Sequence, residues 1–246
     1  MTGSARIHLS VIIPAYDEEL RLPGTLKNVV QYLSGQTYRS EVVIVDDGST
    51  DGTAAVTRSL CSGPVPVRVC SHPDGANHGK GAAVRLGMRE ACGDFRLFMD
   101  ADNSTTVDQV AGFWPAVEQG YDLVIGSRKA RGANVVVHQA WYKELAGRLG
   151  NLVIRVLAVP GVSDTQAGFK LFTRQCVERV FPRLTIDRWG FDIEILAVAR
   201  SLGMRIQELP IAWINSPASK VGALSYFEVM AEVWHIRRNL KSGTYK

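Results

Sequence analysis

The alternation of short apolar runs with helical patterns in the first half of the chain limits the fold more than any other feature. It is typical of a sheet of parallel strands joined by crossover helices. The apolar runs predict strands at 8–13, 41–45, 65–70, 95–99 and 122–125. The periodicity between them predicts helices at 18–33, 51–60, 80–91 and 107–118. We therefore expect an α/β fold with a mostly parallel sheet flanked by helices.

The second half of the chain is richer in helical patterns. It predicts helices at about 138–158, 188–202 and 223–240, and two short strands at 205–209 and 211–214. Neither a repeat nor a low-complexity linker separates the two halves, and 246 residues suffice for one large core. We expect a single domain over residues 1–246.

Polar clusters directly follow four of the predicted strands. They read PAYDEE from residue 14, DDGSTDGT from residue 46, DADNST from residue 100 and GSRKARG from residue 126. Turns and helix caps favour the same residue types. In doubly wound sheets, however, ligands bind at the carboxyl ends of the strands, beside a change in strand order. The repetition at four strand ends therefore predicts a binding site.

Asp100 and Asp102, in the segment FMDADN, are candidate metal ligands. Two close carboxylates repel each other unless a cation lies between them. A divalent ion that also binds a diphosphate would remove this conflict, and oxygen ligands suit Mg²⁺ or Mn²⁺. A helix-capping loop is the alternative, because DNSTTVDQV also resembles a capped helix start.

Other features disfavour several classes of protein. No GxxxxGK[ST] or GxGxxG motif follows the first strand, so P-loop and dinucleotide sites lack their phosphate cradle. The stretch GKGAAVRLG begins a helix instead, and Lys80 at its start can meet a phosphate. The net charge of +4 gives no reason to expect nucleic acid. The four cysteines lack CxxC spacing, no secretory signal opens the chain and no apolar stretch could span a bilayer, so we expect a reduced, cytosolic protein.

Together, the motifs resemble a known family. VIIPAYDEELRLPGTL, VVIVDDGSTDGT, GKGAAVRLGM, MDAD and GSR occur in the order seen in inverting GT-A glycosyltransferases of the second family. VSDTQAGFKLFTR, DRWGFDIEIL and INSPASK resemble the branch that makes polyprenyl-phosphate sugars, above all the dolichyl-phosphate β-glucosyltransferases. The resemblance covers residues 8–240. It implies a nucleotide-sugar-binding half at 8–130 and an acceptor- and membrane-facing half at 131–246.

The resemblance also implies roles at the nucleotide-sugar site. Asp46 would read the nucleobase, Tyr16 could stack on it, and the two acids of the DAD motif would hold Mg²⁺ or Mn²⁺ on the diphosphate. The residues implied are Pro14, Tyr16, Glu18, Asp46, Asp47, Lys80, Asp100, Ala101 and Lys220. Ser104 stands where mannose synthases carry a metal-binding Gln, which favours the glucosyl-type branch and leaves the third metal ligand open.

On the acceptor side, the resemblance implies that Arg128 contacts the acceptor phosphate, helped by Lys143. The sugar pocket would be formed by Asp164, Gln166, Trp189 and Glu194. Core packing is the alternative for Trp189, and simple solvation of a helix is the alternative for Glu194.

Asp192 stands where many members of the family carry a general base. A lipid phosphate has a second pKa of about 6, so it is already a nucleophile at pH 7 and needs no base. Asp192 is therefore expected at the catalytic centre with Asp102 and Arg128, but not as a strict base. Hydrogen bonding to the donor sugar and simple solvation of a helix are the alternative roles.

The favoured function is metal-dependent transfer of glucose from UDP-glucose to polyprenyl phosphate, with inversion at the anomeric carbon. A UDP-N-acetylhexosamine or GDP-mannose donor stays open, as do a sugar-nucleotide nucleotidyltransferase and a non-catalytic nucleotide-sugar-binding protein. The helix at 223–240 and the segment 141–159 mix aromatic and basic residues, which suits a membrane surface, packing on the sheet or a homo-oligomer contact. We expect peripheral attachment to the cytoplasmic face of a membrane.

Overall fold

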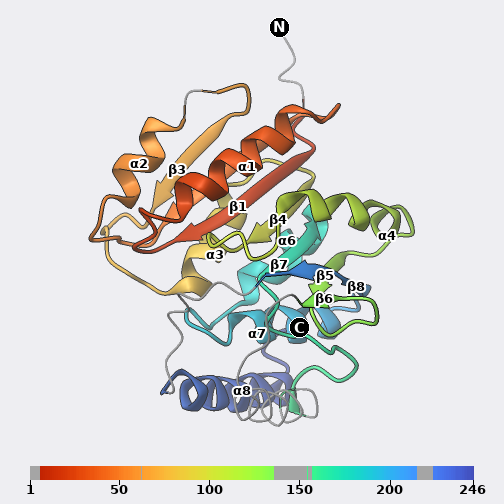
Figure 1. Cartoon of the computed structure of the whole chain (residues 1–246). Helices are drawn as coiled ribbons and strands as arrows, with labels where there is room; N and C mark the ends of the chain where they lie inside the picture. Colours follow the sequence, from red (N-terminus) through yellow and green to blue (C-terminus); the bar gives the residue numbers. More distant parts are fainter. Residues whose placement is uncertain (1–5, 62, 136–153, 155–156, 215–223) are drawn as a thin grey trace, which may run out of the picture.

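The computed structural model describes residues 6–61, 63–135, 154, 157–214 and 224–246. Its centre is a seven-stranded sheet in the order β3-β2-β1-β4-β7-β5-β8 (Figure 1). The strands are β1 (Leu9–Ala15), β2 (Ser40–Asp46), β3 (Val67–Ser71), β4 (Phe95–Met99), β5 (Leu123–Ser127), β7 (Phe169–Thr173) and β8 (Ile206–Pro210). The sheet draws strands from both halves of the sequence. The predicted mostly parallel α/β sheet is confirmed.

One strand of the sheet runs against the others. β7 pairs antiparallel with β4 on one side and with β5 on the other, whereas the other pairs in this sheet are parallel. The sequence analysis predicted no strand in this segment, FKLFT. Its strand character comes from insertion between two buried strands, since Phe169, Leu171 and Phe172 are all at most 1% exposed.

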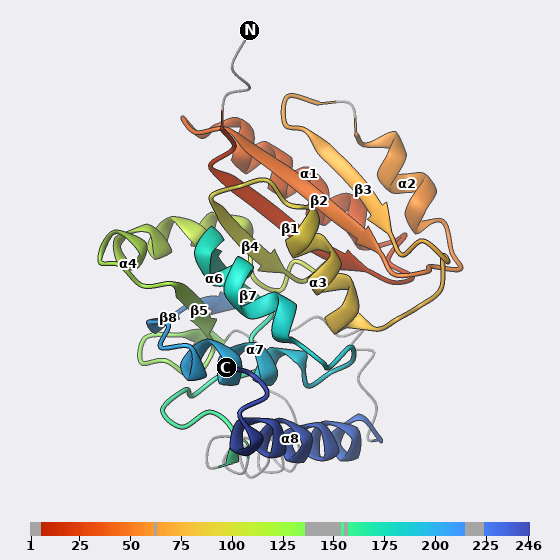
Figure 2. The ribbon, with the colours of Figure 1, turned by 180° about the vertical axis from the view of Figure 1, so that it is seen from behind.

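Helices cover both faces of the sheet (Figures 1 and 2). They are α1 (Leu22–Ser34), α2 (Thr53–Ser59), α3 (Lys80–Glu90), η1 (Val107–Phe113), α4 (Trp114–Glu118), α6 (Arg174–Val180), η2 (Phe181–Arg183), α7 (Phe191–Ser201) and α8 (Leu224–Ser242). The predicted helix at 107–118 begins as a 3₁₀ turn, and α6 was not predicted. The predicted helix at 138–158 lies mostly outside the described residues.

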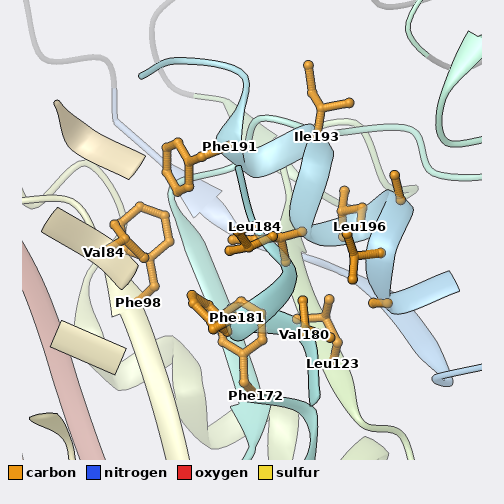
Figure 3. Packing of buried hydrophobic residues seen from close by; sticks show 14 of the residues in the cluster. Val84, Phe98, Leu123, Phe172, Val180, Phe181, Leu184, Phe191, Ile193 and Leu196 are labelled. Atoms are coloured by element: carbon orange, nitrogen blue, oxygen red, sulfur yellow. The ribbon is translucent and has the colours of Figure 1, made fainter. Parts of the chain in front are cut away.

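Two apolar cores lie on opposite faces of the sheet. One contains residues of α1, η1 and α4, and the other contains residues of α3, α6, α7 and α8. Figure 3 shows the second core, where Phe98 of β4 meets Phe191 of α7 at an edge-to-face angle of 67°. The second core therefore joins α7 to the strand that leads into Asp100.

The C-terminal helix α8 packs on the outer side of α7 (Figure 2). Val233 and Ile236 are fully buried in the core, whereas Trp234 between them is 66% exposed. Val233 and Ile236 therefore pack in the core, which is one of the roles that the sequence left open for 223–240. In the part of the chain that the structure describes, no helix has the length and apolar character needed to cross a membrane.

A small sheet of two short strands completes the fold. β6 (Asn134–Val135) pairs parallel with β9 (Ala212–Trp213), the latter close to the predicted strand at 211–214. This pairing positions the segment that follows β8 next to the loop that follows β5. Trp213 reaches the site described below by this route.

Candidate active site

A cavity opens at the carboxyl ends of β4 and β5. It is lined by Asp100, Asp102, Ser104, Thr105, Arg128, Gln166, Ala167, Gly168, Ile211 and Trp213. The chain passes from β1 to β2 and β3 on one side, and then returns to β4 on the other side of β1. The cavity therefore lies beside the change in strand order where open α/β sheets bind ligands. Four residues predicted from the sequence, Asp100, Asp102, Arg128 and Gln166, share this cavity.

Asp100 directly follows β4 and packs against the turn that precedes β7. Its main-chain N–H donates to the carbonyl of Gly168 at 3.1 Å, and a Cβ on Gly168 would lie 2.0 Å from Asp100 Oδ2. Only glycine leaves room for the carboxylate at this position. Asp102 follows two residues later, and its Oδ1 accepts a hydrogen bond from the main-chain N–H of Ser104 at 2.9 Å.

The cavity offers oxygen ligands suited to a divalent metal ion. Asp100 and Asp102 provide two carboxylates, and the buried hydroxyl of Ser104 has no hydrogen-bond partner among the described residues. The described chain contains no cluster of three or more His, Cys, Asp or Glu residues placed to hold a metal. Two carboxylates plus phosphate oxygens and water fit the way that Mg²⁺ is usually bound. The donor set therefore fits a metal that is shared with a diphosphate.

Lys80, at the first turn of α3, extends to the same acids. Its Nζ lies 2.7 Å from Asp100 Oδ1 and 5.6 Å from the centroid of the Phe98 ring. Burial alone would lower the pKa of Lys80, but the charges of Asp100, Asp192 and Asp102 outweigh it and raise the pKa. Lys80 is thus a firmly charged group at the edge of the cavity.

Gly79 allows α3 to begin in this place. It has a φ of 100°, and a Cβ there would lie 2.6 Å from the carbonyl oxygen of Asp187. A side chain would push α3 away from the segment that precedes α7. The close approach keeps Lys80 near the DAD motif.

The loops after β1 and β2 are fastened to each other by side-chain to main-chain hydrogen bonds. Asp17 Oδ1 accepts from Thr50 N at 2.8 Å, and Thr53 Oγ1 accepts from Glu18 N at 2.7 Å. Glu18 also forms an ion pair with Arg21. Some of the polar residues at these two strand ends therefore stabilise the loops.

Asp46 and Asp47 differ in their surroundings. Asp46 Oδ1 accepts from the main-chain N–H of Ser49 at 3.0 Å and is partly accessible. Asp47 is 3% exposed, and its two oxygens accept from His78 N at 3.0 Å and Gly79 N at 2.9 Å. Asp47 therefore shapes the site indirectly, because it holds the loop that leads into α3.

The other residues predicted at the nucleotide-sugar site surround these loops. Tyr16 is 40% exposed, whereas Pro14 is buried at the end of β1. Ala101 is 6% exposed, and its carbonyl accepts from Thr25 Oγ1 at 2.6 Å. Lys143 and Lys220 lie outside the described residues.

Arg128 follows β5 and lines the same cavity as the DAD motif. Its guanidinium donates to the carboxylate of Asp164 from Nε at 2.8 Å and from Nη2 at 2.7 Å. Trp213 lies against it, 5.5 Å from the guanidinium carbon to the ring centroid. Burial would raise the pKa of Asp164, but hydrogen bonding and the charge of Arg128 outweigh it and lower the pKa. Asp164, which the resemblance implies for the sugar pocket, is 1% exposed and orients Arg128.

Asp192 lies at the first turn of α7 and is 5% exposed. Its Oδ1 is paired with Nζ of Lys170, a lysine on β7 that is fully buried. Burial raises the pKa of Asp192, although the charges of Lys170 and Lys80 oppose the rise. The sequence analysis missed Lys170. The signal was a lysine inside an otherwise apolar strand, since buried lysines are rare unless they are paired.

Glu194 does not line the cavity, contrary to the sequence-based assignment. It is fully buried and accepts hydrogen bonds from Thr185 N, Thr185 Oγ1, Ile186 N and the hydroxyl of Tyr245. Its carboxylate fastens the loop before α7 to the C-terminal segment. Trp189 packs against the second core, so its alternative role in core packing is the one that the structure favours.

The fold and the cavity define a class of protein. A mostly parallel sheet with a DAD motif after its fourth strand is the architecture of a GT-A glycosyltransferase. The chain belongs to glycosyl transferase family 2, which matches residues 10–181. The resemblance to this family noted from the sequence motifs is confirmed.

Relatives within the family are similar to this chain over nearly all of its length. The dolichyl-phosphate beta-glucosyltransferase of Dictyostelium discoideum is 33% identical over a gapped alignment of 251 positions, which covers 98% of this chain and 77% of the relative. The dolichyl-phosphate beta-glucosyltransferase of Homo sapiens is 32% identical over a gapped alignment of 255 positions, which covers 97% of this chain and 77% of the relative.

Solved structures share the fold at lower identity. Glucosyl-3-phosphoglycerate synthase from Mycobacterium tuberculosis, in complex with Mn²⁺, UDP-glucose and phosphoglyceric acid, has a TM-score of 0.67 and 19% identity, covering 94% of this chain and 80% of its own. A mannosyltransferase from Pyrobaculum calidifontis, in complex with GDP-Man and Mn²⁺, has a TM-score of 0.62 and 21% identity, covering 95% and 64%.

Proposed function

We propose that the protein transfers glucose from UDP-glucose to the phosphate of a polyprenyl, dolichyl-type lipid, and gives a β-linked lipid phosphosugar. The relatives that match nearly the whole chain bear the name of this activity. The observation that carries the proposal is the shared cavity of Asp102 and Arg128. This shared lining supports a site in which Asp102 helps to hold a metal ion and Arg128 binds a phosphate.

In the proposed reaction, an oxygen of the lipid phosphate attacks the anomeric carbon of glucose while the bond from that carbon to UDP breaks. A divalent ion held by Asp100 and Asp102, Mg²⁺ or Mn²⁺, supplies charge stabilisation to the leaving diphosphate when bound. Lys80, at the start of α3, is placed to contact the same diphosphate. Asp46 and Tyr16, at the ends of β2 and β1, are the proposed contacts of the nucleobase.

Arg128 is the proposed binding group for the acceptor phosphate. Its Nε and one N–H of Nη2 are used by Asp164, so Nη1 and the second N–H of Nη2 are the donors for an anion. Because Asp164 fixes the plane of the guanidinium, these donors need little reordering when a phosphate enters. Gln166, exposed on the cavity wall, is a proposed contact of the donor sugar.

A phosphate nucleophile needs no general base at neutral pH, since its second pKa is about 6. This agrees with the surroundings of Asp192, whose carboxylate is committed to Lys170 and largely closed to solvent. We therefore assign Asp192 to the support of the site rather than to proton transfer.

The acceptor is a lipid, so the proposed protein works at a membrane surface. Trp234, Arg238 and Lys241 are exposed on α8 at spacings of four and three residues, which place them on one side of the helix. An aromatic ring with two cations suits contact with an anionic headgroup layer. Attachment would be peripheral and, for a dolichyl-type acceptor, on the cytoplasmic face.

The donor is the part of the proposal that a direct experiment decides. Purified protein with Mn²⁺ and a short polyprenyl phosphate would be incubated in parallel with UDP-glucose, UDP-N-acetylglucosamine and GDP-mannose. We expect lipid phosphosugar with UDP-glucose at a rate at least tenfold above the other two. Preferential use of GDP-mannose would contradict the assignment of glucose as the sugar. If none of the three donors is used, the proposal that the protein is a glycosyltransferase is contradicted.

A further inference from the structure

A fully buried lysine joins two parts of the site that come from different elements. Nζ of Lys170 donates to the carbonyl oxygen of Ala167 and to Oδ1 of Asp192. Lys170 is 0% exposed, and its two partners belong to the turn before β7 and to the first turn of α7. A buried ammonium is costly to desolvate, so it persists only where its bonds are well satisfied.

The turn held by Lys170 also holds Asp100. Ala167 and Gly168 line the cavity, and the Gly168 carbonyl accepts from the main-chain N–H of Asp100 at 3.1 Å. The Asp100 carboxylate lies so close to Gly168 that a single added carbon would overlap it. A displacement of this turn therefore displaces Asp100.

Lys170 is placed to transmit such a displacement because of its position in the sheet. In the strand register it lies opposite Phe98 of β4 and Ile125 of β5, the strands that lead to Asp100 and Arg128. The Phe98 ring lies 5.9 Å from the Lys170 ammonium and 5.6 Å from the Lys80 ammonium. Two lysines thus contact one ring, and each pairs with a different aspartate.

We propose that Lys170 is a positioning residue of the transfer site, which sets the place of Asp100 by holding the Ala167–Gly168 turn, and which uses Asp192 as its counter-ion. This inference rests on the proposed function, because the proposed function assigns Asp100 to the binding of the metal and the diphosphate. It assigns to the pair of Lys170 and Asp192 a structural task in donor binding, separate from proton transfer.

The test compares the whole wild-type chain with variants at Lys170 and Asp192 in two measurements. Calorimetry measures the binding of UDP or GDP in the presence of Mn²⁺, and the electron spin resonance signal of Mn²⁺ measures binding of the metal alone. K170M is expected to weaken Mn²⁺ and Mn²⁺–nucleotide binding at least tenfold. The double variant K170M/D192N carries no unpaired buried charge and is expected to fold, yet to keep the same defect. D192N alone leaves Lys170 with Ala167 but without its counter-ion, and is expected to weaken binding less than K170M does.

Arg96→Met is the matched control. Arg96 is a buried cation near the other end of β4, bonded to the Met88 carbonyl at 2.7 Å, so its loss should lower stability without changing Mn²⁺–nucleotide affinity. Wild-type affinity in folded K170M, or its restoration in K170M/D192N, would overturn the proposal, since Lys170 would then only neutralise Asp192. The nucleotide that the wild type binds more tightly tests the proposed donor. The ratio of the variant's dissociation constant to that of the wild type tests the positioning role of Lys170.

Discussion

Arg128 and Asp164 form a bidentate ion pair, in which Nε and Nη2 of the guanidinium donate to different oxygens of the carboxylate at 2.8 and 2.7 Å. The main-chain N–H of Arg128 adds a third hydrogen bond to the same carboxylate at 2.9 Å. Asp164 is held in turn by Glu208, whose Oε1 accepts from its main-chain N–H at 2.8 Å. The orientation of Arg128 is therefore built into the fold.

The first prediction concerns Arg128 as the acceptor contact. Arg128→Ala should raise the KM for polyprenyl phosphate by about 10- to 100-fold, since hydrogen bonds to charged groups contribute about 1.5–3 kcal/mol. Binding of UDP should stay within about threefold of the wild type. Steady-state kinetics with the acceptor varied, together with UDP calorimetry, measure the two effects separately.

Loss of Arg128 also leaves Asp164 without its buried partner, so a control for folding is needed. R128A/D164N removes both charges and should show the same acceptor defect as R128A, with a higher melting temperature. An unchanged acceptor KM in both variants would exclude Arg128 from acceptor binding.

The second prediction concerns Asp102 as a metal ligand. Asp102→Asn should lower kcat by at least a thousandfold while the melting temperature stays close to that of the wild type, because a metal ion provides several kcal/mol of transition-state stabilisation. Excess chelator should abolish wild-type activity, and Mn²⁺ or Mg²⁺ should restore it. Full turnover in chelator would contradict metal dependence.

The third prediction separates Asp192 from a general base. Asp192→Asn should lower kcat by less than about tenfold, whereas removal of an essential base costs about 10²–10⁴. The pH profile of kcat in the variant should keep the shape seen in the wild type. A dead but folded Asp192→Asn protein that still binds Mn²⁺ and UDP would show that proton transfer limits the reaction.

The fourth prediction concerns Glu194, which the structure removes from the sugar pocket. Glu194→Ala leaves the N–H groups of Thr185 and Ile186 and the hydroxyl of Tyr245 without their acceptor. Unsatisfied buried donors cost about 1–3 kcal/mol each, not additively, so we expect a loss of about 3–5 kcal/mol in urea unfolding. Glu178→Ala, at an exposed position of α6, is the control and should change stability by less than about 0.5 kcal/mol. A loss below 1 kcal/mol for Glu194→Ala would contradict the assigned role.

Runs of β-branched residues and the polar clusters that follow them were enough to predict several strands and the sheet edge at which they end. The runs of β-branched residues before Asp46 and before Gly126 form buried strands, and the polar clusters that follow them reach the same edge of the sheet. The polar clusters that contain Asp100, Asp102 and Arg128 were noted because each follows a predicted strand, whereas the role given to Arg128 came from the resemblance to the family. Strand ends of one sheet edge meet in space whatever their distance in sequence.

Pairing between distant segments was not predictable in this way. β7 is a strand because β4 and β5 flank it, and nothing within FKLFT marks its antiparallel direction. The partners of Asp164 and Asp192 lie 36 and 22 residues away in sequence, so the assignment of Asp164 to a sugar pocket missed its bond to Arg128. Glu194 was misassigned for the same reason, since its partner Tyr245 is 51 residues away.

The most direct test of the account compares two acceptors that differ only in the phosphate. The protein, with Mn²⁺ and radiolabelled UDP-glucose, would be given a short polyprenyl phosphate or the matching polyprenol, and the label in the lipid phase would be counted. We predict transfer to the phosphate only, in a product that releases glucose under mild acid. Transfer to the polyprenol, or none to the phosphate, would contradict a phosphate nucleophile bound at Arg128.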